Sequence, residues 1–274
     1  MIFDVAAEVL ANTRLSDDYN VLSLAAPEIA RVAAPGQFVM MKTSTGWDPL
    51  LRRPFSIFEV LRDRGNIVGL SLLNKRVGTG TARLYDAKPG ERLGCLGPLG
   101  QPFVPVGPPG DAWMVAGGVG LAPFATLADA LVALGTPMTL FYGARRAIDL
   151  YRADAFEALG ARLMLTTEDG SRGEMGRVTG PLERELAAVP AGAALTIYAC
   201  GPTPMMQAVA AIGARFGRRV FVSLEPVMGC GMGGCYSCVV RVTRGAGSHL
   251  VRSCLEGPVF NAASIIWDAL PAGH

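Results

Sequence analysis

The sequence predicts a β-barrel at residues 1–106, a doubly wound parallel α/β sheet at 107–222 and a small cysteine-rich domain at 223–274. Three observations predict this order. Short β-branched runs fill the first part, strands alternate with helical segments in the second, and four of the six cysteines fall in the last. At 274 residues the chain is long enough for two domains and an appendage. Half of its residues are hydrophobic and 18% are charged, which indicates a globular protein rather than a disordered one.

The first domain is predicted from short strands separated by turn residues. Many short runs without a long helical pattern favour a closed barrel, and turns such as the proline and glycine at positions 35 and 36 separate them. The clearest linker in the chain is the proline- and glycine-rich segment 104–110, which marks the end of this domain. The expected strands are Tyr19–Leu24, Gln37–Met41, Ile67–Leu73 and Arg92–Leu96.

In the second domain, apolar strands alternate with helical segments. Such alternation is typical of a parallel sheet whose crossover helices cover its faces. The expected strands are Trp113–Ala116, Met138–Tyr142, Arg162–Thr166 and Ala194–Ala199, and the expected helices are 123–134 and 204–215.

Four cysteines near the C-terminus have the spacing C-x4-C-x2-C-x15-C. This is the spacing of plant-type [2Fe–2S] sites, and the surrounding glycines let the backbone turn its N–H groups toward cluster sulfurs. A bacterial [4Fe–4S] site would need C-x2-C-x2-C, and a Rieske centre would need two histidine ligands, whereas the chain has only His249 and His274. Zinc ribbons usually pair two C-x2-C knuckles, and this chain has only one such knuckle. A zinc site or disulfides remain the alternative explanations of the cysteines. The predicted metal ligands are Cys230, Cys235, Cys238 and Cys254.

Two segments of the predicted barrel suit a bound flavin nucleotide. The stretch 53–56 places an arginine and a serine on either side of an aromatic ring, and arginine can hold a phosphate with two hydrogen bonds. The stretch 78–81 opens a helix with glycines and threonines, and a helix N-terminus attracts a pyrophosphate. Taken alone, each segment is better explained by ordinary structure: a surface arginine before a core phenylalanine at 53–56 and, by a narrow margin, an N-capped helix at 78–81. Their combination in one barrel is the informative feature.

A glycine-rich turn at 117–120 follows a strand and precedes a helix, which is where doubly wound sheets receive nucleotides. It lacks G-x-G-x-x-G spacing, so an ordinary dinucleotide dehydrogenase is poorly supported, and a simple tight turn explains the glycines about as well. Cys200, with Gly201 and Pro202, ends a later strand at the same edge of the sheet. Its thiol would line a nicotinamide pocket without being a nucleophile, or would simply be a buried structural cysteine.

Charge and the missing motifs narrow the function further. The net charge of +2 gives no electrostatic reason to expect nucleic acid or an anionic membrane as a partner. No stretch has the pattern of a membrane span and the N-terminus lacks that of a signal peptide, so we expect reduced thiols in the cytoplasm. No G-x-S-x-G or histidine-rich motif occurs, so we expect no catalytic side chain and a chemistry carried by cofactors.

The complete set of short motifs is 35–39, 53–56, 78–81, 97–100, 116–123, 141–145, 167–171, 199–202 and 223–225, followed by the cysteines. With them the chain resembles, over essentially its whole length, the ferredoxin–NADP reductase superfamily. Within it, the chain is most similar to the electron-transfer subunits of the NAD-dependent two-subunit dihydroorotate dehydrogenases. The specific motif is the compact cysteine tail that directly follows the nucleotide domain. Relatives usually have glycine in place of Ser237 and vary at Met228-Gly229, but neither departure removes a ligand.

The resemblance implies a division of labour in pyrimidine biosynthesis. An FMN-containing catalytic subunit would oxidise dihydroorotate to orotate, in a heterotetramer with two copies of each subunit. Electrons would pass singly through [2Fe–2S] to FAD in this chain, and FAD would give a hydride to NAD+ over Cys200. The chain has no room for a barrel of eight β/α units, so dihydroorotate must be oxidised elsewhere.

The resemblance also assigns residues to each cofactor. The cluster would take the four cysteines, FAD would lie on two strands and a helix start, and NAD would lie on the two turns of the α/β domain. The implied FAD residues are Arg53, Pro54, Phe55, Ser56, Leu73, Asn74, Lys75, Gly80 and Thr81. The implied NAD residues are Gly118, Val119, Gly120, Cys200, Gly201 and Pro202.

Two other functions stay open. A related subunit of a sulfide dehydrogenase, a hydrogenase or a bifurcating NAD(P)H–ferredoxin oxidoreductase would share this domain order, although some of these replace a cluster cysteine with aspartate. A non-enzymatic zinc-binding interaction module would be colourless, whereas flavin and cluster make a protein brown-yellow. NAD rather than NADP follows from the resemblance. Arg145 and Arg146 would suit a 2′-phosphate, but paired arginines are more often solvated surface charges.

Overall fold

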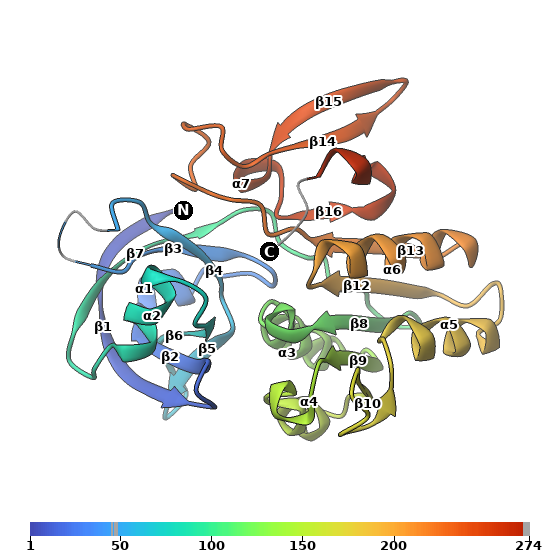
Figure 1. Ribbon diagram of the computed structural model, residues 1–274, viewed down its shortest axis with the longest axis horizontal. Coiled ribbons are helices and arrows are strands. Elements are labelled where there is room, and N and C mark those ends of the chain that lie inside the picture. The colour runs from blue at the N-terminus through green and yellow to red at the C-terminus, as the bar shows by residue number, and fades with distance from the viewer. Residues whose placement is uncertain (45, 47–48, 271–274) are drawn as a thin grey trace.

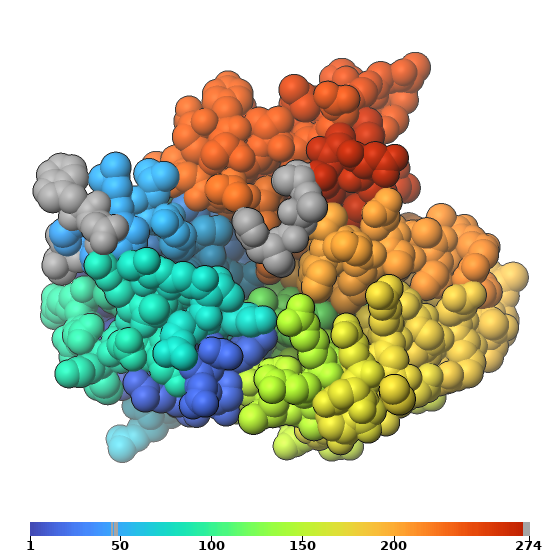
Figure 2. Space-filling view, in the orientation of Figure 1, coloured from blue at the N-terminus to red at the C-terminus, as the bar shows by residue number. Residues whose placement is uncertain are grey.

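The structure is a computed structural model that describes residues 1–44, 46 and 49–270. Residues 271–274, the end of the predicted third domain, lie outside the described residues. The chain forms three parts (Figure 1): an antiparallel sheet, an α/β part beside it and a C-terminal part that lies along both. Figure 2 shows the orange and red surface of the C-terminal part against the blue surface of the first part and the light-orange surface of the second.

The first part is a seven-stranded antiparallel sheet with the order β4-β3-β7-β1-β2-β6-β5. It forms a half-barrel, less closed than the barrel we expected, because β4 and β5 are its two edges. Ile57 and Phe58 connect β4 to β5. Both side chains are almost fully buried, so this connection packs against the core. The elements are β1 (Phe3–Arg14), β2 (Tyr19–Ala25), α1 (Pro27–Ala30), β3 (Phe38–Lys42), β4 (Arg53–Ser56), β5 (Glu59–Asp63), β6 (Asn66–Lys75), α2 (Thr79–Asp86) and β7 (Arg92–Leu99).

The half-barrel core follows from alternating apolar side chains. Leu22 on β2 lies opposite Leu72 on β6, and both are fully buried. The two helices add Ile29 and Leu84 to the same core, so α2 is held against the sheet by apolar packing. The start of α2 is thereby placed close to β4, where the sequence predicts a nucleotide.

The second part is a sheet whose parallel strands have the order β11-β10-β9-β8-β12-β13. An apolar cluster lies on each face of this sheet. The four strands expected here are present, and β12 is buried along its whole length, as a central parallel strand requires. Among the described residues no helix is long and apolar enough to cross a membrane. The elements are β8 (Asp111–Gly117), η1 (Gly118–Leu121), α3 (Phe124–Leu134), β9 (Met138–Ala144), η2 (Ala147–Asp149), α4 (Ala153–Ala158), β10 (Arg162–Thr167), β11 (Glu174–Met175), α5 (Thr179–Ala188), β12 (Leu195–Cys200), α6 (Thr203–Arg215) and β13 (Arg219–Ser223).

The C-terminal part leaves the α/β sheet after β13 and returns to its edge. Its last strand, β16, pairs antiparallel with β13, so the segment that carries the cysteines is anchored at both ends. The elements are β14 (Val239–Arg244), β15 (Gly247–Arg252), α7 (Ser253–Glu256), β16 (Val259–Asn261), η3 (Ala262–Ser264) and η4 (Trp267–Ala269).

Among the described residues, side chains of the half-barrel contact those of the α/β part, and three of these contacts lie at Tyr151 and Arg152. The hydroxyls of Ser16 and Tyr151 lie 2.8 Å apart, and the rings of Tyr19 and Tyr151 are 4.5 Å apart. Arg152 donates to Glu59 at 2.5 Å. These contacts hold the predicted flavin strands at a set distance from the glycine turn of the α/β part.

Candidate functional site

Arg53 on β4, Thr43 after β3 and Gly80 on α2 meet beside the half-barrel. A Cβ on Gly80 would stand 3.3 Å from Cγ of Arg53 and 3.5 Å from Oγ1 of Thr43. The Thr43 hydroxyl is buried and has no hydrogen-bond partner among the described residues, whereas buried hydroxyls are normally bonded. N–H groups in the first turn of a helix also lack intrahelical partners. A guanidinium, an unpartnered hydroxyl and a helix start together form a place for an anion.

Thr81 and Asn74 use their side chains to hold the start of α2. The Thr81 hydroxyl accepts hydrogen bonds from the backbone N–H groups of Val77 and Gly78, at 2.9 and 3.0 Å. The Asn74 amide donates to the backbone oxygen of Thr81 at 3.0 Å and to Oδ1 of Asn20 at 2.7 Å. The backbone of this turn, rather than these two side chains, is therefore what a ligand would meet.

The other predicted flavin residues lie on β4 and β6. Pro54 and Ser56 are half-buried, and Phe55 packs partly against the half-barrel core. Leu73 is buried, and Lys75 at the end of β6 is exposed. The structure thus brings Arg53 and Gly80 together and gives Phe55 a share in the core.

The two turns predicted at the edge of the α/β sheet are in direct contact. Their strands, β8 and β12, are parallel neighbours, so the residues that follow them meet. A Cβ on Gly120 would stand 2.3 Å from the backbone oxygen of Cys200, and one on Gly201 would stand 3.0 Å from Cα of Gly117. Gly118 has a φ of +54°. Side chains would not fit at this approach, so glycine is required.

Cys200 is fully buried and its sulfur lies 3.8 Å from Oε1 of Glu225. Burial raises the pKa of the Cys200 thiol well above its ordinary value, and the Glu225 carboxylate adds to the rise. Glu225 is exposed at the surface, and desolvation by the neighbouring protein raises the pKa of its carboxyl above the ordinary value. The Cys200 thiol is consequently neutral at pH 7. Of the neighbouring predicted residues, Val119 is half-buried and Pro202 is exposed.

The four C-terminal cysteines gather in two pairs. Cys235 is exposed, and its thiol interacts with that of Cys230. The pKa of Cys235 is lowered to about 6, mainly by a hydrogen bond with the Ser237 hydroxyl. Cys238 and Cys254 are buried, and the backbone N–H of Cys254 lies 3.5 Å from Sγ of Cys238. Burial, and then the Cys238 thiol, raises the pKa of Cys254 to about 12. In the described part of the chain, no three His, Cys, Asp or Glu side chains enclose a single metal ion.

The cysteine loop packs against the strands of the half-barrel. Gly231 has a φ of +74°, and a Cβ there would stand 2.5 Å from Cγ of Met40 on β3. Met40 pairs with Pro54 on β4, so β3 contacts both the cysteine loop and the predicted flavin strand. The two buried cysteines belong to one apolar cluster with the half-barrel, namely Phe38, Met40, Leu96, Leu99, Met228, Cys238 and Cys254.

Sequence reasoning assigned no role to three residues at these sites. Thr43 and Met40 belong to no motif. Their roles become visible only in the fold, where residues far away in the sequence contact them. Glu225 lies in one of the recognised motifs, and an acidic residue just before a cysteine loop is a signal that would have drawn attention to it.

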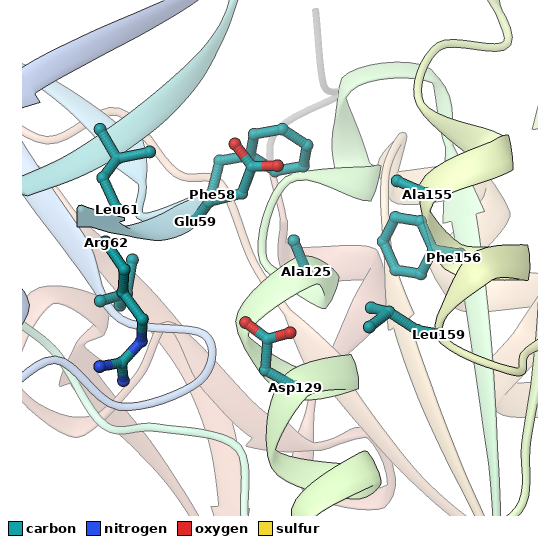
Figure 3. Close-up of a pocket in the computed structure, with 10 residues that line it drawn as sticks. Phe58, Glu59, Leu61, Arg62, Ala125, Asp129, Ala155, Phe156 and Leu159 are labelled. Atoms are coloured by element: carbon teal, nitrogen blue, oxygen red, sulfur yellow. The ribbon is translucent and has the colours of Figure 1, made fainter. Parts of the chain in front are cut away.

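A separate cavity lies between β5 and the helices α3 and α4 (Figure 3). It measures about 370 Å³, and Glu59 and Asp129 lie at its wall. Burial, and then the charge of Glu59, raises the pKa of the Asp129 carboxyl. None of the predicted cofactor residues lines this cavity, so it is distinct from the sites above.

Comparison with known proteins identifies the family of the chain. The family model of the iron-sulfur cluster binding domain of dihydroorotate dehydrogenase B matches residues 225–266, and that of the oxidoreductase NAD-binding domain matches residues 114–211. The dihydroorotate dehydrogenase B (NAD(+)) electron transfer subunit of Desulforamulus reducens is 37% identical over 267 residues, covering 97% of this chain and 99% of that protein. The chain belongs to the family of dihydroorotate dehydrogenase B electron transfer subunits. The subunit of Geobacillus thermodenitrificans, another member, is 36% identical over 94% of this chain and 96% of its own length.

Solved structures confirm the predicted fold class of this electron transfer subunit. An NADH-dependent reduced ferredoxin–NADP oxidoreductase, studied for flavin-based electron bifurcation, has a TM-score of 0.84 and 28% identity, covering 96% of this chain and 91% of that one. The ferredoxin reductase of carbazole 1,9a-dioxygenase shares the fold with a TM-score of 0.61 and 23% identity, covering 78% of this chain and 65% of that one. The predicted redox class is confirmed as well: this is an oxidoreductase subunit with an iron-sulfur cluster binding domain and an NAD-binding domain.

Proposed function

We propose that this chain carries electrons from a dihydroorotate-oxidising partner to NAD+, with FAD and [2Fe–2S] as its resident cofactors. The partner would be an FMN-containing catalytic subunit, in a cytoplasmic heterotetramer with two copies of each chain. One observation carries the proposal: β3 contacts the cysteine loop through Met40 and pairs with β4, which bears Arg53. The two sites therefore share one short strand.

The cysteines fit a two-iron cluster better than a single metal ion. A [2Fe–2S] cluster takes four thiolates, two on each iron, and the pairs Cys230–Cys235 and Cys238–Cys254 supply this set. The backbone N–H of Met232 lies 3.4 Å from Sγ of Cys230, which adds a donor to sulfur. We infer that these four residues would hold the cluster.

The residues of the half-barrel fit FAD. Arg53, the Gly80 backbone and the unpartnered Thr43 hydroxyl would receive its pyrophosphate. The remaining proposed contacts are Pro54, Phe55, Ser56, Leu73 and Lys75, while Asn74 and Thr81 would act by holding the start of α2. When bound, FAD and the cluster supply the exchange between one-electron and two-electron transfer.

The turns of the α/β part fit NAD. The missing side chain at Gly118 would let a dinucleotide approach the backbone, Gly120 lets the turn pack against Cys200, and Val119 lies between them. Cys200, Gly201 and Pro202 would border the nicotinamide. The neutral thiol of Cys200 offers an uncharged wall there, and its buried position helps to exclude water.

Reconstitution with a partner tests the proposed function. We expect the chain alone to oxidise NADH with artificial acceptors but to leave dihydroorotate unchanged. Addition of an FMN-containing dihydroorotate-oxidising subunit should give dihydroorotate-dependent formation of NADH, followed at 340 nm. Turnover of dihydroorotate by the isolated chain would contradict this division of labour.

Replacing Arg53 by alanine is expected to weaken FAD binding by about 10- to 100-fold, because hydrogen bonds to a charged group contribute roughly 1.5–3 kcal/mol. Titration of the flavin-free chain with FAD, followed by flavin fluorescence, measures the effect. The matched control is Arg14→Ala, since Arg14 is an exposed arginine that pairs with Asp86 at the far end of α2. An unchanged affinity in the Arg53 variant would remove this residue from the flavin site.

We expect hydride transfer with NADH to exceed that with NADPH. Arg146 is exposed and already pairs with Asp149 at 3.3 Å, so its charge is partly compensated. Rates of flavin reduction by the two nucleotides, measured under the same anaerobic conditions, give the preference. Faster reduction by NADPH, lost in Arg145→Ala, would instead assign a 2′-phosphate site to the arginines.

A second candidate function is that of a subunit of a bifurcating NAD(P)H–ferredoxin oxidoreductase. It is favoured by the TM-score of 0.84 and 28% identity to the NADH-dependent reduced ferredoxin–NADP oxidoreductase. Copurification with untagged neighbours separates the two candidates, because one predicts a dihydroorotate-oxidising partner and the other a partner that reacts with ferredoxin and NADP.

A further inference from the structure

We propose that the Ser237 hydroxyl donates a hydrogen bond to the cluster-bound sulfur of Cys235 and thereby raises the reduction potential of the cluster. The two atoms, Oγ of Ser237 and Sγ of Cys235, lie 3.1 Å apart. The inference rests on the proposed function, because it requires a cluster on the four cysteines. It gives a role to a side chain that is not itself a ligand.

The direction of this hydrogen bond follows from the contacts of Ser237. Its oxygen already accepts a hydrogen bond from the backbone N–H of Gly229 at 2.8 Å. The hydroxyl proton is therefore left to point elsewhere, and the Cys235 sulfur lies within reach. A sulfur bound to iron is a thiolate and has no proton to give, so the serine must be the donor.

The local backbone brings Cys235 and Ser237 to the same side of the loop. The residue between them, Tyr236, has a φ of +59°, in the left-handed region that non-glycine residues seldom adopt. Arg252 secures this turn: its guanidinium lies 4.9 Å from the centre of the Tyr236 ring and donates to the backbone oxygen of Gly233 at 2.9 Å. A turn held at this cost fits a functional position.

The sign of the effect follows from charge. Reduction adds an electron to the cluster, and a hydrogen bond to one of its sulfurs stabilises the added negative charge. Loss of the hydroxyl should therefore make reduction less favourable. Because Ser237 is exposed and water competes for the sulfur, we expect a moderate loss. The equilibrium constant for reduction should fall by about three- to tenfold, where tenfold corresponds to 59 mV for one electron.

The test compares Ser237→Ala with Ser237→Thr in the full chain, purified anaerobically. Thr keeps the hydroxyl, so it should restore the potential that Ala lowers. Redox titrations followed by electron paramagnetic resonance give the midpoint potential, and iron and sulfide assays show whether the cluster is present. The matched control is Ser248→Ala, on the exposed strand β15, which should leave the potential unchanged.

A second measurement compares resonance Raman spectra of the wild-type chain and Ser237→Ala. Exchange into D2O should shift an iron–cysteine stretching band in the wild-type chain, and the shift should be smaller in Ser237→Ala, where only backbone N–H donors such as that of Met232 remain. A wild-type spectrum that does not respond to D2O would overturn the proposal, as would equal potentials in wild type and Ser237→Ala. Loss of iron and sulfide from the wild-type chain itself would be a failure of the proposed function instead. If only the Ala variant loses its cluster, the isotope shift of the wild-type chain and the midpoint potential of the Thr variant test the proposal instead.

Discussion

Replacing Cys238 by serine is expected to remove the cluster and to lower dihydroorotate-dependent NADH formation with the partner by about 100-fold or more, since even indirect supports of a metal site contribute about 10- to 100-fold. Cys238 is 2% exposed and belongs to the apolar cluster that joins the cysteine loop to the half-barrel. A serine there would offer a poor iron ligand in a site that water cannot easily enter. Iron and sulfide content and the rate of NADH formation measure the loss.

The control for this variant is Cys95→Ala. Cys95 is also fully buried, but it lies on β7 in the half-barrel core and outside the cysteine loop. It should keep its iron, its flavin and its activity with the partner. NADH oxidation by artificial acceptors should survive in both variants, because it needs only the flavin and nucleotide sites. A Cys238→Ser chain that retained iron and sulfide would contradict the ligand assignment.

The second large effect is expected for Gly120→Ala. A Cβ at this position would stand 2.3 Å from the backbone oxygen of Cys200, and a backbone atom cannot yield as a flexible side chain would. The turns that follow β8 and β12 must therefore separate. We expect a stability loss of about 1–3 kcal/mol from overpacking and, because small displacements at a reacting site are costly, about a 100-fold loss of kcat/KM for NADH.

Gly180→Ala is the matched control for Gly120→Ala. Gly180 lies in α5, and a Cβ there would meet nothing within 4 Å. The substitution should leave NADH oxidation unchanged and should stabilise the helix slightly. Thermal unfolding and steady-state NADH oxidation are measured on both variants, with FAD content as a check on the half-barrel. Wild-type kinetics in Gly120→Ala would show that the contact between the two turns does not shape the nucleotide site.

Local sequence patterns predicted the fold class and the candidate sites, because both depend on short motifs of chemically distinct residues. The cysteine spacing and the glycine turn at 117–120 depend on neighbouring residues, and the strands around them have strong apolar runs. The 12-residue strand β1 was not predicted, since Ala6, Ala7 and Ala11 favour a helix locally and only pairing with β2 and β7 makes the segment extended.

The relations between sites could not be predicted from sequence patterns. Strand β16 has only three residues, too few for a periodic signal, and it becomes a strand by pairing with β13. The packing of Met40 against Gly231 joins positions 191 residues apart. Such contacts depend on the whole fold, and they are the ones that place the cysteine loop beside the predicted flavin strand.

The most direct test of the account is the content of iron, acid-labile sulfide and FAD in the chain purified anaerobically. The account predicts about two irons, two sulfides and one FAD per chain, because four thiolates hold one [2Fe–2S] cluster. A properly folded chain that contained zinc, or that lacked acid-labile sulfide, would contradict it.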